Sequence, residues 1–261
     1  MFETARYETG RRVRGTVILT VAIALYSAFI IWYFTVLEGI NLEDVFQDLP
    51  PAMMEAFGIE ALSTIEGFLG AELYNFVWVL GLGLYFAYAA GGIIATDIEN
   101  ERMDLLLSFP ISRSQLLAEK FASLLFPIVV VNIFVGGAIY FFASAIGESI
   151  DPVYLVLVHV LSIPYLLVCA GIGMVFSVMV SRAAIAERGA IGVVFVLFLV
   201  ESVVGGADEY DWIQYVSPTY YYEPTPILID GTYELIDTGI LLVAFFGLLL
   251  LSQILFHRRD I

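Results

Sequence analysis

The chain has 261 residues, of which 60% are hydrophobic, and its mean hydropathy is +0.90. Soluble globular domains contain roughly 45–50% apolar residues, so this composition excludes a water-soluble domain and predicts a polytopic membrane protein. The net charge of −16 combines 11 basic with 27 acidic residues, and we expect no nucleic-acid partner for so acidic a chain.

Six apolar segments have the length of about 20 residues that a helix needs to cross a bilayer. They are predicted at about residues 15–37, 73–96, 121–146, 153–180, 189–206 and 236–256. The first is too long for the apolar part of a signal peptide and shows no small-residue cleavage pattern, so we expect it to be retained. The fold class is therefore all-α, with a single transmembrane domain over residues 1–261.

All the basic residues fall on one side of this predicted topology. They are Arg6, Arg11, Arg12, Arg14, Arg102, Arg113, Lys120, Arg182, Arg188, Arg258 and Arg259. The segments that hold them alternate along the chain with segments that hold none, which are 38–72, 147–152 and 207–235. Because Lys and Arg mark the cytoplasmic side, we expect a multi-pass protein of the cell membrane with both termini in the cytoplasm.

The two long segments on the opposite side are acidic. Residues 38–72 contain eight Asp and Glu residues, and residues 207–235 combine acidic residues with Tyr, Trp and Pro. With ten Arg to one Lys, we interpret this excess as a salt-adapted, halophilic exterior, while a cation-binding surface stays open as an alternative. The prolines forbid a long helix in 207–235, so we expect short interfacial pieces rather than a folded external domain.

The cytoplasmic segment between the second and third spans, residues 98–121, is the most polar part of the predicted cytoplasmic side. Residues 98–109 contain no Gly or Pro and are rich in helix formers, which predicts an amphipathic helix lying across the membrane surface. Pro110 disfavours the helical conformation of Phe109 and should end the helix there.

A second helix is predicted to begin directly after this proline. Ser112 and Gln115 have the spacing of a capping box, and Ile111 and Leu116 that of a hydrophobic staple. We expect this helix to run without a break into the third span. A force on the first helix would then reach a transmembrane helix rather than a flexible loop.

The same loop carries the clearest resemblance to a known family. The order Asp-Leu-Leu-Leu-Ser-x-Pro-Ile-Ser-Arg, ending in Lys, resembles the loop between the second and third spans of ABC-2 type transporter permeases. The matching residues are Asp104, Leu105, Leu106, Leu107, Ser108, Pro110, Ile111, Ser112, Arg113 and Lys120. The external segment YVSPTYYYEPTPILIDGT looks like the Ser-Pro-aromatic segment before the last span of that family. One departure is Glu101-Arg102, where the family often has Gly-Thr, and we expect a more regular helix as a result.

The resemblance implies the transmembrane subunit of an ABC transporter, with this loop acting as the coupling helix against an ATPase. A P-loop needs glycines before a lysine, and Lys120 has none nearby, so this chain is not an ATPase by that route. We therefore expect a separate ATP-binding subunit that holds ATP and Mg, and no cofactor, metal or catalytic residue in this chain. Candidate contacts with that subunit are Glu99, Glu101, Arg102 and Asp104. Arg113, in the first turn of the second helix, is either a further contact or a ligand of lipid phosphate.

Polar residues inside the spans are functional candidates by default. His159 is interpreted as packed against a neighbouring helix carbonyl, with a proton relay as the alternative. Glu201 either reaches the interface or faces a path for a cationic substrate, so His159 and Glu201 are the candidates for a translocation path. Asn132 and Asn75 should bond across helices, Gly pairs should mark close helix approach or flexibility, and the single Cys169 should be a buried thiol.

We predict a permease that works as a homodimer or paired subunit with two ATPase subunits. Export is the expected direction, because the external segments show no domain that could receive substrate from a binding protein. No motif of the sequence specifies the substrate. The alternative function is a secondary transporter or channel without an ATPase, for which internal repeats or paired broken helices are typical.

Overall fold

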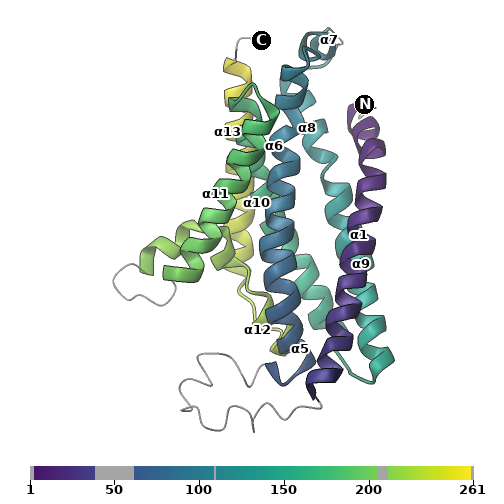
Figure 1. The fold of residues 1–261 in the computed structure, drawn as a ribbon. Coiled ribbons are helices and arrows are strands. Elements are labelled where there is room, and N and C mark those ends of the chain that lie inside the picture. The colour runs from purple at the N-terminus through teal and green to yellow at the C-terminus, as the bar shows by residue number, and fades with distance from the viewer. Residues whose placement is uncertain (1–2, 39–61, 109, 205–210, 260–261) are drawn as a thin grey trace.

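The structure is a computed structural model that describes residues 3–38, 62–108, 110–204 and 211–259. In these ranges all regular structure is helical, which confirms the predicted all-α fold (Figure 1). The α-helices are α1 (Glu3–Glu38), α5 (Ile65–Phe68), α6 (Gly83–Glu99), α7 (Met103–Leu107), α8 (Arg113–Ala122), α9 (Leu125–Ile146), α10 (Pro152–Met179), α11 (Ala183–Val204), α12 (Pro224–Asp230) and α13 (Leu235–Arg258). A π-helix, η1 (Leu69–Leu82), joins α5 to α6, and two 3₁₀ helices, η2 (Asp211–Val216) and η3 (Pro218–Tyr221), precede α12.

Six helical runs in the described part of the chain are long and apolar enough to cross a membrane, as predicted. They are Thr4–Leu37, Ile65–Glu99, Arg113–Ile146, Pro152–Met179, Ala183–Glu201 and Leu235–Arg258. The start of α1, the end of α13 and the short helix α7 lie at one end of the molecule, which we call the α7 end (Figure 1). Helices α5 and α12 lie at the opposite end, which we call the α12 end.

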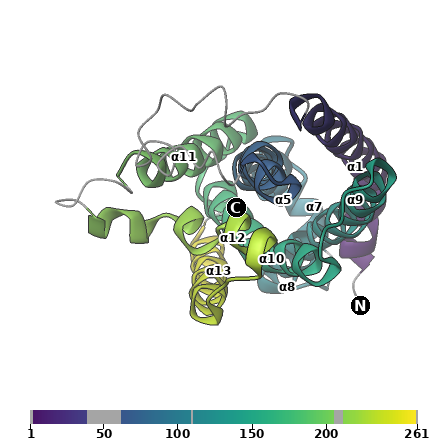
Figure 2. The same ribbon diagram turned by 90° about the horizontal axis from the view of Figure 1, so that it is seen from below.

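The bundle is built around α10, which packs most extensively against α6 and α13. Figure 2 shows α1 beside α9 on one side of α10, with α11 and α13 on the other. In the most apolar stretch of each helix, 67% of the residues of α10 are buried, compared with 17% in α11 and 22% in α13. The helices on the outside therefore present apolar side chains to their surroundings, as expected of a protein solvated by lipid.

The second span begins as a π-helix, which the sequence did not lead us to expect. In an α-helix residues nine positions apart face opposite sides. Leu69 and Trp78 are nine apart, yet both are fully buried, because a helix with i→i+5 bonds has more residues in each turn. The buried residues form two rows along the helix, residues 69, 73, 78 and 82 and residues 70, 74, 79 and 83. Successive residues in each row are four, five and four positions apart. The π-helix thereby turns both Tyr74 and Trp78 towards α10.

Glycine permits the closest helix contacts, as predicted for the glycine pairs. A Cβ atom on Gly173 of α10 would overlap the backbone carbonyl of Ala87 on α6. A Cβ atom on Gly91 of α6 would lie 3.0 Å from the Cα atom of Glu187 on α11. Helix α6 is therefore held between α10 and α11 by direct backbone packing.

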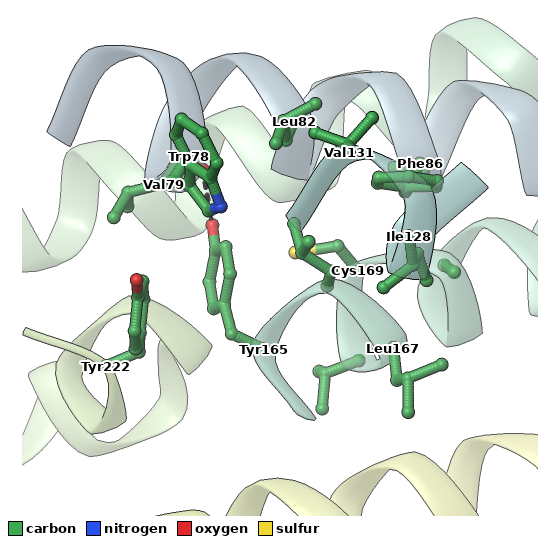
Figure 3. Packing of buried hydrophobic residues seen from close by; sticks show 14 of the residues in the cluster. Trp78, Val79, Leu82, Phe86, Ile128, Val131, Tyr165, Leu167, Cys169 and Tyr222 are labelled. Atoms are coloured by element: carbon green, nitrogen blue, oxygen red, sulfur yellow. Dashed lines mark hydrogen bonds between the residues drawn. The ribbon is translucent and has the colours of Figure 1, made fainter. Parts of the chain in front are cut away.

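The segment before the last span is anchored in the core by a pair of tyrosines (Figure 3). The Tyr165 hydroxyl donates to the carbonyl oxygen of Val79 at 2.6 Å, and its ring stacks on Tyr222 with centroids 5.6 Å apart. The Tyr222 hydroxyl donates to the carbonyl oxygen of Val158 at 2.9 Å. Cys169 is fully buried nearby, which confirms the buried thiol. Helices η2, η3 and α12 are short pieces against the bundle, as predicted for this segment.

Candidate functional site

The α7 end begins with a sharp turn after α6. The N–H of Arg102 donates to the Asp97 carbonyl at 2.8 Å and the N–H of Glu101 to the Ile98 carbonyl at 3.1 Å. These two bonds form a Schellman motif, whose left-handed position is usually glycine. Here that residue is Glu101, with φ of 56°. The turn is kept although the residue is not glycine, so the prediction of a more regular helix at Glu101 was wrong.

The predicted helix over 98–109 is also wrong in its extent. Ile98 and Glu99 belong to α6, and α7 contains only Met103–Leu107. Phe109 lies outside the described residues. The cause is the Schellman turn, which ends α6 four residues before α7 begins.

Helix α7 displays a mixed surface. Met103 is buried and Leu106 is partly buried against the core, whereas Asp104 is exposed and Leu105 is 64% exposed. The sequence pattern places Leu105 with Leu106 on the apolar face of the predicted helix, so Leu105 was not among the predicted contacts. Its exposure could not be read from the pattern, because α7 is too short to follow the longer amphipathic face predicted for it.

Helix α8 begins as predicted. The Ser112 hydroxyl accepts a hydrogen bond from the N–H of Gln115 at 3.2 Å, which confirms Ser112 as the N-cap. The Gln115 side chain also binds within α8, where its Nε2 donates to Glu119 Oε1 at 2.8 Å.

The predicted helix from Ser112 into the third span forms one helical run, Arg113–Ile146, but it is interrupted by a tight turn. Helix α8 ends at Ala122, a turn follows at Ser123 and Leu124, and α9 starts at Leu125. Pro127 explains the turn, because proline has no N–H for the carbonyl of Ser123 and its ring would clash with that carbonyl. This signal was present in the sequence and was overlooked.

Of the five predicted partner contacts, three lie together on the exposed surface. Glu101, Arg102 and Asp104 are exposed around α7. Glu99 is also exposed, but its carboxylate accepts a hydrogen bond from the N–H of Ala183 at 2.9 Å, at the start of α11.

Arg113 has partners in the last span rather than a free guanidinium. Its Nη1 donates to the carbonyl oxygens of Phe256 at 3.1 Å and Arg259 at 2.6 Å, and it lies 5.8 Å from the centre of the Phe256 ring. A cation at the end of α13 is favoured by the helix dipole. Arg259 in turn donates to the carbonyl of Val178 and to the Ser181 hydroxyl, and burial lowers its pKa. The ends of α8, α10 and α13 are thereby joined.

A cavity of about 740 Å³ lies at the α7 end between α1, α7 and α8. Its wall includes Tyr7 and Arg11 from α1, Arg102 and Leu105 from the α7 region, and Lys120 from α8. The surface that surrounds α7 is therefore hollow and lined by both apolar and charged groups.

His159 lies in a network of side chains inside the bundle. Asn132 Nδ2 donates to the Ile128 carbonyl, so its Oδ1 atom is the acceptor for the Trp78 indole at 3.1 Å and for His159 Nδ1 at 2.9 Å. His159 Nε2 then accepts from the Tyr74 hydroxyl at 3.0 Å. Both ring nitrogens of a neutral imidazole are used, by side chains rather than by the helix carbonyl expected. Asn132 bonds across helices as predicted, whereas Asn75 is exposed.

Glu201 lies in a different place. It lines a cavity of about 400 Å³ at the α12 end, together with Asn75, Tyr222 and Glu223. His159 instead lines a largely apolar groove of about 510 Å³ between α9 and α10. The structure therefore does not bring His159 and Glu201 to one cavity. No group of three or more His, Cys, Asp or Glu side chains that could hold a metal occurs among the described residues.

The comparison with protein families agrees with this architecture. The family described as ABC-2 family transporter protein matches residues 9–261, which include α7, α8 and all or part of each of the six spans. A comparison with curated proteins found no match. The chain belongs to the ABC-2 family of transporter proteins and is a multi-pass membrane permease.

Proposed function

We propose that this chain is the permease subunit of an ATP-driven exporter, and that a separate ATP-binding subunit docks on the α7 end. The observation that carries the proposal is the exposed surface of Glu101, Arg102, Asp104 and Leu105, which we call the α7 tip. An exposed leucine among charged side chains is suited to a protein groove with an apolar centre and a polar rim.

The α7 tip is held firmly on both sides. The Schellman turn fixes it to α6, and the Ser112 cap begins α8 three residues after Phe109. A push on the tip would therefore reach α6 and α8 directly. We assign partner contacts to the tip, and intramolecular roles to Glu99 and Arg113, whose side chains already bind α11 and α13.

The α7 end is the cytoplasmic end in this proposal. Described basic residues of the loops and helix ends, such as Arg102, Arg182 and Arg258, belong to segments at this end, and the positive-inside rule places such residues in the cytoplasm. ATP is available there, so the docking surface and the nucleotide are on the same side.

A second permease copy is part of the proposal. Near the α7 end, Tyr88 of α6 and Glu187 in the first turns of α11 share a side-chain hydrogen bond, yet Tyr88 is 45% exposed and Glu187 is only partly buried. A carboxylate facing lipid is costly, so residues of this kind face protein or a water-filled path. We propose that the face with α6 and α11 meets the second copy and lines the path between the two.

Export is supported by the α12 end. The described helices there, α5, η2, η3 and α12, pack on the bundle and form no separate domain for a substrate-delivering protein. A substrate would then enter from the cytoplasm or the inner leaflet.

The test is co-purification with the candidate ATPase, followed by changes at the α7 tip. Leu105→Asp and Asp104→Lys should each weaken binding of the ATPase at least tenfold and reduce ATPase activity of the complex in parallel. Asp230→Lys makes the same charge change on an exposed residue of the α12 end and should leave binding unchanged. If both α7-tip variants bind the ATPase normally, the docking assignment is wrong. Transport without any ATPase would favour a secondary transporter or channel.

A further inference from the structure

The only lysine of the chain is buried where three helices meet. Lys120 of α8 is 3% exposed, and its Nζ lies 2.6 Å from Asp97 Oδ2 of α6 and 2.9 Å from Glu8 Oε1 of α1. Glu8 is in turn 4.0 Å from Arg11. Two cations thus balance two carboxylates, and the one that joins all three helices is Lys120.

The contact with α6 lies at the base of the loop that carries α7. Asp97 is 7% exposed, and its carbonyl is the acceptor that closes the Schellman turn with Arg102. The Lys120–Asp97 pair therefore fastens α8 to the last turn of α6, directly below the α7 tip.

The contact with α1 is the middle one of three. The N–H of Thr4 donates to Glu119 at 3.2 Å, Glu8 binds Lys120, and Arg12 Nε donates to Ser123 Oγ at 3.1 Å. Thr4, Glu8 and Arg12 are four residues apart and so share one face of α1. The end of α8 and the Ser123 turn thus contact two turns of that face.

Resting on the proposed function, we propose that Lys120 is the positioning residue that fixes α1 and α6 to α8, so that movement of the α7 tip reaches both spans together. If α8 slid along α1 or α6, Lys120 would separate from Glu8 or Asp97 and leave that carboxylate without its cation. The cost of an unpaired buried charge therefore opposes such sliding. The three helices then move as one body during the transport cycle.

The variants are chosen to separate positioning from folding. Lys120→Met removes the cation, and the triple variant Glu8→Gln, Asp97→Asn, Lys120→Met removes the lysine together with both of its carboxylates. Lys120→Arg keeps the cation, and the neighbouring cavity of about 740 Å³ has room for the larger head group. Arg258→Met is the matched control, because it removes an exposed cation at the same end.

The first measurement needs no ATPase. Hydrogen exchange is measured on the permease in nanodiscs. In Lys120→Met and in the triple variant, backbone amides in the first three turns of α1 and in the 97–102 turn should exchange at least tenfold faster than in the wild type. Exchange in α10 should stay unchanged, and Lys120→Arg should exchange like the wild type. Unchanged exchange in α1 and in the 97–102 turn would overturn the inference, whatever the fate of the proposed function.

The second measurement uses the complex with its ATPase. Spin labels at Val36→Cys on α1 and Leu235→Cys on α13 report the outer ends of two spans, and Cys169 is too buried to be labelled. Trapping with ATP and vanadate should change this distance in the wild type and in Lys120→Arg. In the triple variant we expect less than half of that change at an ATPase rate within twofold of wild type. A full change in the triple variant would refute the inference, whereas failure of the wild type to bind or respond would refute the proposed function alone.

Discussion

Replacing Glu101 with glycine should stabilise the protein, because Glu101 holds the left-handed position of the Schellman turn with φ of 56°. A side chain in this conformation costs about 1–2 kcal/mol. Glycine avoids that cost but loses about 0.5–1 kcal/mol through its greater freedom in the unfolded chain. The expected net gain in unfolding free energy is about 0.5–1 kcal/mol.

The assay is thermal unfolding in detergent at one fixed scan rate, with Glu101→Ala as the matched variant. Alanine also removes the carboxylate but keeps the left-handed cost, so the difference between the two variants isolates the backbone effect. The unfolding temperature of Glu101→Gly should be about 1–4 °C higher than that of Glu101→Ala, since 1 kcal/mol corresponds to about 2–4 °C in a chain of this size. If alanine is as stable as glycine or more so, the backbone reasoning is refuted.

Gly147 supplies an internal comparison at the end of α9. It occupies the same position of a Schellman turn, with φ of 93° and bonds from Gly147 to Ser144 and from Glu148 to Ala143. Gly147→Ala should therefore destabilise the protein, in the opposite direction to Glu101→Gly. If Glu101 also contacts the ATPase, the glycine variant will be more stable and yet bind that subunit more weakly, as expected where strain is kept at a functional site.

Three further predictions concern the spans and the α12 end. Gly173→Ala should lower the unfolding temperature because the new Cβ overlaps an α6 carbonyl, whereas Gly192→Ala, with open space around it, should raise it slightly. Asn132→Leu should cost about 2–4 kcal/mol in unfolding stability by leaving an indole and an imidazole N–H buried without an acceptor, and Asn75→Leu, at an exposed site, should cost little. Burial, and secondly the nearby Asp237 carboxylate, raises the pKa of Glu223 in the folded protein. Folding therefore favours the protonated form of Glu223, and the stability of the fold decreases as pH rises through that pKa. Glu223→Gln should therefore gain unfolding temperature relative to wild type at pH 8 more than at pH 4.

The number of spans and the polar α7 region could be predicted from hydropathy and charge, because lipid requires long apolar helices. The π-helix could not, since an α-helix and a π-helix need equally apolar sequences. Its signal is the burial of Leu69 and Trp78 on one side, and burial is known only once α10 is in place.

The candidate site was predictable in its location but not in its details. The exposed positions of Glu101, Arg102 and Asp104 are compatible with the predicted contacts, which remain a prediction. The binding of Arg113 to α13 depends on a helix that begins more than a hundred residues later, so no local pattern could reveal it. The ion pairs of Lys120 were not predicted from the sequence, because its two carboxylate partners lie on other helices, α1 and α6.

The turn that Pro127 imposes changes how a push on α7 can travel. With a continuous helix, α8 would move the third span directly, and α1 and α6 would follow only through side-chain packing. The turn at Ser123 and Leu124 bends the helical run between α8 and α9, and α8 also makes polar connections to other spans. These are Lys120 to α1 and α6, and Arg113 to α13. We infer that α8 acts as a hub that distributes motion to the first, second and last spans as well as to the third.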